Sequence, residues 1–457
     1  MICTVITGPS FQEAQKQIEA SIHANADLVE LRLDSFTSLN IKALEQLRIS
    51  YSIPMIFTLK NHKSPKEILP LNPEFIDLEL DNPFIAQVPP NQLILSYHNF
   101  THTPQDLDII YEEMLKTPAA FYKIAVQANH TIEALRLLCW IKKKNDKKII
   151  AISMGKQGQI SRILAPVMGC PFTYASLDKE NTLGQLPIQT LLKQYHHKQL
   201  NPQTALYGLI GDPVEQSISN YTHNAFIRVH DQNAVYIKMQ IDPLNLLDFF
   251  RYAKELDFKG LSVTMPLKEE IMPYLDVIDT QALRIGAVNT IKFEHGKTIG
   301  YNTDGMGALN AIEKKKAVRG KQIVILGAGG TAKAIAYEAK KRGAFVTLVN
   351  RNQERAQKVA ERLECRSGEM QPGYDILINS TPVKMPIVED KIQNALIMDV
   401  GIKSKESPFL QTALNKGCPV VHGIEMFKEQ ALGQYAIWKA ETQLTNSLLQ
   451  GRINIIV

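Results

Sequence analysis

The sequence predicts an α/β protein in two parts: an N-terminal (β/α)8 TIM barrel, followed by a two-lobed α/β half with a Rossmann-like dinucleotide fold. Three observations support this prediction: the length of the chain, eight short apolar runs in its first half, and a glycine-rich turn between two apolar runs in its second half. At 457 residues the chain is roughly three times the ~150 residues of a typical domain. We therefore expect more than one hydrophobic core.

The composition is that of a globular protein. Hydrophobic residues make up 45% and charged residues 21%, which excludes disordered and collagen-like chains. A net charge of +5 is too dilute for a nucleic-acid partner to be expected. The five cysteines lie far apart with no CxxC spacing, so we expect no disulfide framework, no metal site and a reducing cytoplasm. Since we find no targeting leader and no apolar run long enough to cross a bilayer, we also expect no membrane association.

The first half alternates strand-like and helix-like segments. Between most of the strand-like runs, apolar residues recur at i, i+3 and i+4, as in residues 11–24, which is typical of amphipathic helices. Near-continuous apolar strands separated by helices predict parallel strands that close into a barrel. The eight strand-like runs are residues 2–7, 27–34, 54–60, 75–80, 92–98, 121–127, 147–154 and 172–177.

The chemistry of such a barrel gathers at the carboxyl ends of its strands. Lys123 lies inside an apolar run, where a lysine must either pair its charge or lose it. Desolvation lowers the pKa of a buried lysine, so a neutral amine that attacks a ketone is one interpretation and an ion pair with a carboxylate is the other. The other polar residues near strand ends are Glu30, Arg32, Asp34, Lys60, His98 and Arg162.

This half resembles type I 3-dehydroquinate dehydratase through residues 30–34, 96–104, 122–127, 153–162 and 180–187. The resemblance implies that Lys123 forms an imine with the C3 ketone of 3-dehydroquinate. It also implies that His98 removes the C2 proton and protonates the leaving hydroxyl, and that Arg162 binds the carboxylate. Glu30, Arg32 and Gln185 would bind the substrate hydroxyls and support the imidazole, and Lys60 would also contact the substrate. Four positions depart from the family pattern: Lys60 replaces an arginine, Ser64 a glutamate, Leu183 a proline, and Asn181 a hydroxyl residue.

A polar, proline-containing stretch at 195–204 separates this half from the next, so we predict domains at 1–202 and 203–457. Strand-like runs at 205–211, 234–241, 259–266 and 287–293 alternate with helical stretches and predict a first lobe over 203–305. Residues 306–424 form the predicted nucleotide-binding lobe, and helices at about 425–457 are expected to return to the first lobe.

Residues 322–349 run from an apolar strand through a glycine turn and a helix to a second strand. Gly327, Gly329 and Ala332 fit G-x-G-x-x-A, which lets backbone amides approach a pyrophosphate. The second strand ends at Asn350-Arg351, with Arg355 one turn later and no carboxylate. Because arginine binds phosphate oxygens with paired donors, this end favours the 2′-phosphate of NADP over NAD.

The first lobe contains two groups that could manage an alcohol proton, Lys268 and Asp304, although such residues more often form surface ion pairs. The half as a whole resembles shikimate dehydrogenase through residues 211–224, 262–269, 286–290, 300–307, 327–334, 379–382 and 422–431. The resemblance implies Lys268 as the acid/base at the C3 oxygen. It assigns the substrate to Ser217, Ser219, Thr264, Asn289, Asp304 and Gln430. It assigns NADP to Gly327, Ala328, Gly329, Gly330, Asn350, Arg351, Arg355, Thr381 and Gly423. The departures in this half are Asn220, Lys333, Lys384 and Ile402.

The product of the first reaction is the substrate of the second. We therefore predict a bifunctional shikimate-pathway enzyme whose partners are small molecules and NADP(H). Three alternatives remain open: an aldolase-like Schiff-base lyase, a protein in which one half has decayed into a binding module, and an NAD-dependent quinate oxidation, which Arg351 and Arg355 disfavour.

Overall fold

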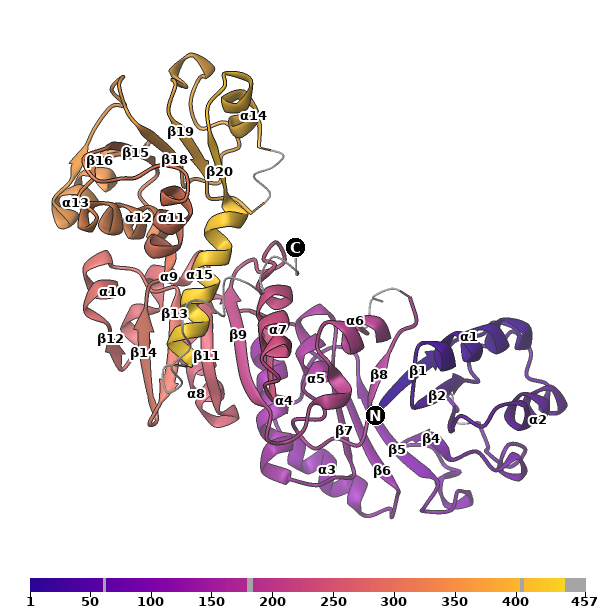
Figure 1. Cartoon of the computed structure of the whole chain (residues 1–457). Coiled ribbons are helices and arrows are strands. Elements are labelled where there is room, and N and C mark those ends of the chain that lie inside the picture. Colours follow the sequence, from indigo (N-terminus) through magenta and orange to yellow (C-terminus); the bar gives the residue numbers. More distant parts are fainter. Residues whose placement is uncertain (61–62, 179–183, 403–406, 440–457) are drawn as a thin grey trace. The chain divides into compact units, whose positions relative to one another are not determined.

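The computed structural model describes residues 1–60, 63–178, 184–402 and 407–439 (Figure 1). The chain divides into two compact units. One contains Met1–Leu206, Ile227–Ile241 and Leu247–Asp257, and the other contains Tyr207–Phe226, Asp242–Leu246 and the described residues from Phe258 onward.

The first unit contains the predicted barrel. Its strands form one eight-stranded parallel sheet in the order β7-β6-β5-β4-β3-β2-β1-β8. Within the described ranges no pairing joins β7 to β8, so the barrel is nearly closed. The strands, each within or next to a predicted run, are β1 (Ile2–Ile6), β2 (Leu28–Arg32), β3 (Met55–Thr58), β4 (Phe75–Glu79), β5 (Leu93–Asn99), β6 (Phe121–Gln127), β7 (Ile149–Met154) and β8 (Thr173–Ala175).

Alternate strand residues fill the barrel interior. One apolar cluster contains Cys3, Ile56, Ile94, Ile150 and Ile152, as expected when successive side chains point to opposite faces of a sheet. The helices of this half are α1 (Phe11–His23), α2 (Ile41–Ser50), α3 (Leu107–Leu115), α4 (Thr131–Lys144), α5 (Gln159–Ile163) and α6 (Ile188–Lys193). Helix α1 contacts β1 and β2, and α4 and α5 contact β7.

The same unit takes in β10 (Ala234–Gln240) and most of α8 (Leu246–Leu256). Lys142 Nζ on α4 donates to Glu255 O at 2.8 Å, and Gln157 Nε2 donates to Gln240 Oε1 at 3.2 Å. Because of such contacts, the first unit includes segments that follow residue 202, the predicted domain boundary.

A second sheet has the order β10-β9-β11-β13-β14-β12. The sequence predicted β9 (Ala205–Gly211), β10, β11 (Phe258–Val263) and β13 (Thr290–Glu294), but it missed β12 (Val277–Ile278) and β14 (Lys297–Tyr301). The associated helices are α7 (Ser219–Val229), α9 (Leu267–Glu270) and α10 (Thr280–Ile285).

Helix α15 (Gly423–Trp438) contacts β11 and β13 of this sheet. Gln434 Nε2 donates to Asn289 O at 3.0 Å, and Trp438 Nε1 donates to Ile291 O at 2.9 Å. The rest of the predicted C-terminal helices, residues 440–457, lies outside the described residues.

The third sheet is the predicted dinucleotide fold, with strand order β17-β16-β15-β18-β19-β20 and only parallel pairs. Ile323 and Ile325 belong to one apolar cluster, Val324 and Leu326 to another, so helices cover both faces. The strands are β15 (Gln322–Leu326), β16 (Phe345–Val349), β17 (Arg366–Ser367), β18 (Ile376–Asn379), β19 (Leu396–Asp399) and β20 (Val420–His422). The helices are α11 (Asp304–Glu313), α12 (Gly330–Lys341), α13 (Gln353–Leu363) and α14 (Pro408–Asn415).

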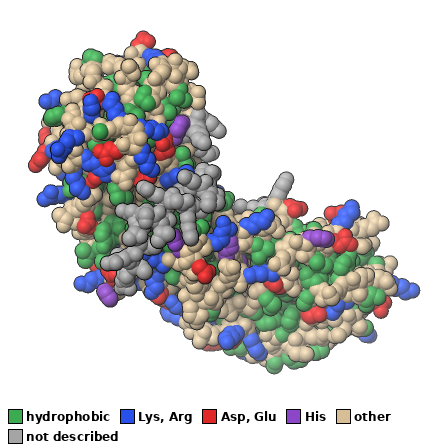
Figure 2. Space-filling view, in the orientation of Figure 1, with side chains coloured by type: hydrophobic (Ala, Val, Ile, Leu, Met, Phe, Trp, Pro, Cys, Tyr) green, Lys and Arg blue, Asp and Glu red, His purple; other side chains and the backbone are tan. Residues whose placement is uncertain are grey.

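Charged side chains of both signs are interspersed on the face shown in Figure 2. In the described part of the chain, no helix is long and apolar enough to cross a membrane.

Candidate active sites

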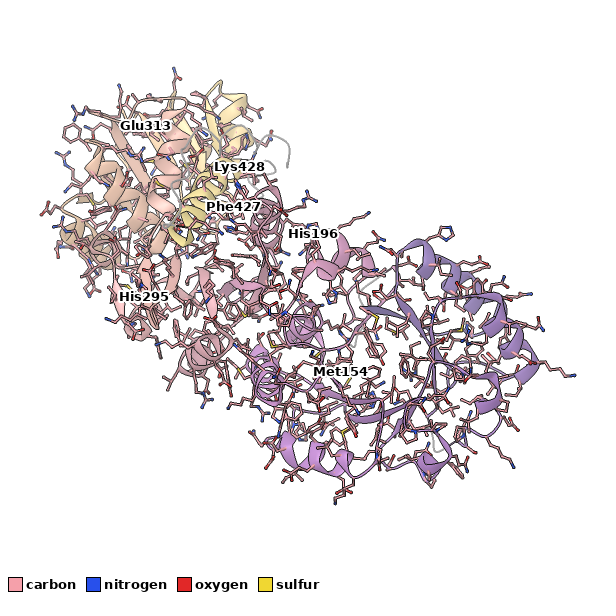
Figure 3. All side chains as sticks on the ribbon, turned by 60° about the horizontal axis from the view of Figure 1, so that its bottom comes forward. Met154, His196, His295, Glu313, Phe427 and Lys428 are labelled. Carbon is pink, nitrogen blue, oxygen red and sulfur yellow. The ribbon has the colours of Figure 1, made fainter. Side chains whose placement is uncertain are left out.

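The barrel holds a cavity of about 150 Å³ at the carboxyl ends of its strands. Met154, at the end of β7, is one of its apolar lining residues and is labelled in Figure 3. Seven residues that the sequence singled out also line it: Glu30, Arg32, Lys60, His98, Lys123, Arg162 and Gln185. The fold therefore brings side chains from separate strands and loops into one cavity.

Lys123 is buried in this cavity and carries its charge. Its ammonium forms an ion pair with Asp77 on β4, and it lies 3.7 Å from Glu30 Oε1. Burial, the largest single influence, lowers the pKa of Lys123, but Asp77 and Glu30 together outweigh burial and raise the pKa above its ordinary value. The structure therefore shows the pair with a carboxylate, in which the charge of Lys123 is favoured rather than lost.

Asp77 was not singled out from the sequence. It is fully buried, and Ser96 Oγ donates to its Oδ1 at 2.7 Å. The signal that could have found it is an acidic residue in the apolar run at 75–80, since a buried carboxylate needs a partner.

His98, at the end of β5, contacts a carboxylate that the sequence reasoning also missed. Its Nδ1 lies 2.8 Å from Glu79 Oε1, and Glu79 forms a second ion pair with Lys60. Because a carboxylate only accepts hydrogen bonds, we assign the proton to Nδ1, which leaves Nε2 as an acceptor. Burial is the main reason that the pKa of His98 lies below its ordinary value, so the imidazole is neutral at neutral pH.

The contact between Glu79 and His98 corrects the expectation about support of the imidazole. Glu30 accepts a hydrogen bond from Thr58 Oγ1 at 2.7 Å, and Arg32 pairs with Asp34 at 2.6 Å. The carboxylate in contact with His98 is Glu79.

Arg162, on α5, supplies a buried positive charge to the cavity. Its Nε donates to Gly184 O at 3.1 Å, and its Nη1 donates to Tyr174 O at 3.4 Å. Burial lowers the pKa of Arg162 to about 10, so the guanidinium stays charged at neutral pH. A charged guanidinium with forked donors suits a carboxylate group.

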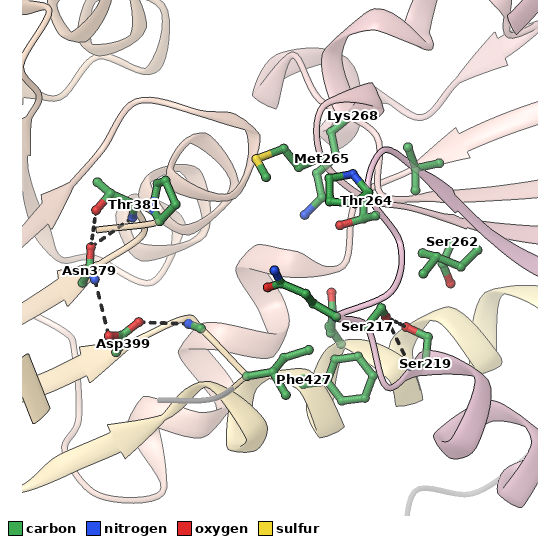
Figure 4. Close-up of a pocket in the computed structure, with 18 of the residues that line it drawn as sticks. Ser217, Ser219, Ser262, Thr264, Met265, Lys268, Asn379, Thr381, Asp399 and Phe427 are labelled. Atoms are coloured by element: carbon green, nitrogen blue, oxygen red, sulfur yellow. Dashed lines mark hydrogen bonds between the residues drawn. The ribbon is translucent and has the colours of Figure 1, made fainter. Parts of the chain in front are cut away.

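A second cavity, of about 500 Å³, lies in the other unit. Figure 4 shows Lys268 and Thr264 on one side of it and Asn379 and Thr381 on the other. Ser217 Oγ and Ser219 Oγ lie 2.7 Å apart at its wall. The predicted residues that line this cavity are Ser217, Ser219, Thr264, Lys268, Thr381 and Gln430.

The predicted pair of Lys268 and Asp304 is present and is not a surface ion pair. The two side chains form an ion pair, and Asp304 is 1% exposed. Asn289 Nδ2 donates to Asp304 Oδ1 at 2.7 Å and to Gln430 Oε1 at 3.2 Å. Lys268 Nζ also donates to Thr331 Oγ1 at 3.0 Å, a contact that sequence reasoning missed although Thr331 belongs to the glycine-turn motif.

The glycine turn has the backbone that a bound pyrophosphate requires. Gly327 has φ +118°, and a Cβ there would lie 2.6 Å from Ser380 Oγ, whereas a Cβ on Gly329 would meet nothing within 4 Å. Gly330 begins α12, so the free amides of the helix point toward this turn. Parallel pairing of Leu326 with Val349 places Asn350 and Arg351 beside it.

Arg351 and Arg355 are exposed, and Arg355 Nη2 lies 3.3 Å from Glu269 Oε1. The glycine turn and these arginines lie outside the lining of the cavity, as does Gly423 at the start of α15. The described residues fit a dinucleotide with an added phosphate. No group of three or more His, Cys, Asp or Glu in the described part of the chain is arranged to hold a metal ion.

Comparison with known proteins assigns each half to a family. Residues 2–202 match the model of type I 3-dehydroquinase, residues 209–291 that of the shikimate dehydrogenase substrate binding domain, and residues 310–403 that of shikimate / quinate 5-dehydrogenase.

Two relatives match along both halves. The chain is 37% identical to the shikimate biosynthesis protein AroDE of Chlamydia pneumoniae, over 96% of this chain and 95% of the relative. It is 31% identical to the chloroplastic bifunctional 3-dehydroquinate dehydratase/shikimate dehydrogenase of Arabidopsis thaliana, over 96% of this chain and 82% of the relative. Among solved structures, a shikimate dehydrogenase from Aquifex aeolicus is 36% identical with a TM-score of 0.52, over 55% of this chain and 98% of that one.

Proposed function

The chain belongs to the family of bifunctional 3-dehydroquinate dehydratase/shikimate dehydrogenases, and from that premise we propose which of its residues perform each reaction. It is a lyase and an oxidoreductase of the shikimate pathway. We assign dehydration of 3-dehydroquinate to residues 1–202 and reduction of 3-dehydroshikimate to residues 203–457, an assignment that the limits of the matched family models support.

In the dehydratase, Lys123 condenses with the C3 ketone of 3-dehydroquinate. Its ammonium, held by Asp77, must first lose a proton to solvent, because only the free amine adds to a carbonyl. The amine then adds to the carbonyl carbon, and loss of water leaves an imine. Arg162 binds the substrate carboxylate in this arrangement.

The imine draws electrons away from the neighbouring carbon, which makes the C2 proton acidic. Neutral His98 takes this proton on Nε2, while Glu79 at Nδ1 stabilises the imidazolium that forms. The same imidazolium returns a proton to the leaving hydroxyl, and hydrolysis of the imine frees Lys123. The single observation that carries this assignment is a buried lysine and a partly buried histidine, each with its own carboxylate, in one cavity.

In the dehydrogenase, Lys268 manages the proton at the C3 oxygen. Asp304 holds the ammonium in place, and Asn289 fixes the Asp304 carboxylate. Ser217, Ser219, Thr264 and Gln430 are placed to bind the carboxylate and hydroxyl groups of the substrate.

NADPH, when bound, would supply the hydride for this reduction. We assign its pyrophosphate to the glycine turn, Gly327 to Gly330, and its 2′-phosphate to Arg351 and Arg355, with Asn350, Thr381 and Gly423 as further contacts. A shikimate dehydrogenase 36% identical to this chain, with a TM-score of 0.52, was solved in complex with NADP+. Since the five cysteines are all free, we place the enzyme in a reducing cytoplasm.

Two of the alternatives lose support. An aldolase-like lyase would not match a type I 3-dehydroquinase model over residues 2–202. An inert half would not be expected to keep its acid/base pair, yet Lys123 with His98 and Lys268 with Asp304 are all in place. Among the departures, Lys60 still contacts Glu79, and Ile402 lines the second cavity without a hydroxyl.

Borohydride trapping tests the imine. With 3-dehydroquinate present, the wild-type chain should gain one reduced adduct, and peptide mapping should place it on Lys123. Lys123→Ala should abolish both the adduct and dehydration while NADPH-dependent reduction continues, and the exposed-lysine control Lys116→Ala should behave as wild type. An adduct on another residue, or none, would contradict the assignment.

A further inference from the structure

Tyr174 on β8 carries a buried hydroxyl that neither proposed mechanism uses. The side chain is 3% exposed and lines the barrel cavity together with Lys123 and Arg162. Among the described residues, its Oη has no hydrogen-bond partner. Buried hydroxyls are nearly always paired, because an unpaired one loses its hydrogen bonds to water without replacement.

Packing explains the ring of Tyr174 but not its oxygen. The ring meets Phe172 edge to face at 5.5 Å between centroids, inside the apolar cluster of the barrel. A phenylalanine would fill the same volume and leave no unpaired polar atom. The hydroxyl therefore needs a reason outside the apolar core.

Tyr174 lies close to both Lys123 and Arg162, the residues proposed to bind the substrate in this cavity. Lys123 Nζ lies over the ring, 5.1 Å from its centroid. Arg162 Nη1 donates to the backbone oxygen of Tyr174 at 3.4 Å. A substrate joined to Lys123 and held by Arg162 comes to lie next to Tyr174.

The chemistry of the hydroxyl determines what it can recognise. Burial, reinforced by the negative charges of Glu30 and Asp77, raises the pKa of Tyr174 well above its ordinary value. The phenol stays protonated throughout the working range, so it can donate a hydrogen bond to an oxygen atom.

We propose that the Tyr174 hydroxyl donates a hydrogen bond to an oxygen of the substrate bound at Lys123, and so selects an oxygen-rich cyclic keto acid over an analogue without that oxygen. The inference rests on the proposed dehydratase function and adds a specificity-determining residue to it. Sites built to pair with a substrate oxygen discriminate strongly, because the protein group is left unpaired with the wrong ligand.

Tyr174→Phe tests the inference because it removes only the oxygen. Without substrate, the variant should unfold at the same temperature as wild type or a higher one, because an unpaired buried hydroxyl is gone. The kcat/KM for 3-dehydroquinate should fall about fivefold, mainly through KM, as expected for one lost hydrogen bond. Reduction of 3-dehydroshikimate should be unchanged.

Tyr122→Phe is the matched control. Tyr122 is a buried tyrosine of the same sheet, but its hydroxyl donates to Thr117 O at 3.2 Å. This variant should melt at a lower temperature and keep the wild-type KM, so the two substitutions have opposite signatures.

Borohydride trapping tests the role of Tyr174 separately from the dehydratase assignment. A KM for Tyr174→Phe within twofold of wild type, with the adduct still on Lys123, would overturn the role of Tyr174 and leave the dehydratase assignment standing. Failure of the wild-type chain to trap an adduct on Lys123 would overturn both.

Discussion

At the scale of single residues, the proposed dehydratase mechanism turns on the charge of Lys123. Its neighbours, rather than its burial alone, set that charge, because Asp77 and Glu30 share the cavity. The sequence predicted the reactive lysine from one polar residue in an apolar run. It could not predict the charge state, because Asp77 lies on another strand and only the barrel brings the two side chains together.

The ion pair also stabilises the barrel over a defined pH range. Lys123 has a raised pKa when folded, so its contribution is complete below the ordinary lysine pKa of about 10 and is lost as the pH rises through the folded value. The pKa of Asp77 is lowered, mainly by Lys123 acting against burial. Its contribution is therefore present above about pH 4 and is lost as the pH falls through the folded value.

Asp77→Asn removes the strongest support of the lysine charge. Since burial then outweighs Glu30, the pKa of Lys123 should fall and the amine should become neutral at lower pH. The acidic limb of the pH profile for adduct trapping should therefore move to lower pH. Breaking the buried pair should also reduce the free energy of unfolding by up to about 3 kcal/mol.

The test is to measure the rate of adduct trapping by intact mass across a range of pH, for the wild-type chain and for Asp77→Asn. Asp34→Asn is the control, because Asp34 pairs with Arg32 rather than with Lys123. An acidic limb that stays in place would show that Asp77 does not set the charge of Lys123.

At the scale of elements, the strands with apolar runs were predictable, whereas β12 and β14 were not. All eight barrel strands fall within or next to predicted apolar runs. By contrast, β14 follows β13 after a turn at His295 and Gly296, both with positive φ, in a polar stretch that gives little strand signal. The two-residue strand β12 is too short to leave any periodic pattern.

The turn between β15 and α12 is the element to which we assign the pyrophosphate of NADP(H). Gly327→Ala places a methyl group 2.6 Å from Ser380 Oγ at a backbone of φ +118°. The KM for NADPH should rise severalfold because the turn must shift away from the pyrophosphate position, while dehydration should be unaffected.

Gly320→Ala provides the matched comparison for this turn. Gly320 also has a positive φ, +74°, but a Cβ there meets nothing within 4 Å. The free energy of unfolding of this control should fall by only ~1 kcal/mol, the cost of an alanine at positive φ, and its KM for NADPH should be unchanged. Equal KM values for the two variants, measured by steady-state kinetics, would contradict the role of the turn.

At the scale of the whole molecule, the sequence predicted the cavity residues better than their partners. Residues such as His98 could be found because parallel strands end at one edge, so residues near strand ends converge there. Asp77, Glu79 and Thr331 could not be assigned as partners, because a contact between side chains of separate strands or lobes depends on register and packing. The missed residues are those that contact Lys123, His98 and Lys268, the groups to which we assign catalysis.

Among the described residues, the lining of each cavity comes from a single unit. We therefore expect an equimolar mixture of Lys123→Ala and Lys268→Ala chains to convert 3-dehydroquinate to shikimate through released 3-dehydroshikimate. Because the second reaction must wait for that intermediate to accumulate, NADPH consumption should begin with a lag. The wild-type chain, at the same concentration of active dehydratase and dehydrogenase sites as in the mixture, should show the same lag in NADPH absorbance. A wild type without a lag would contradict this, because the intermediate would then pass between sites of one chain without release.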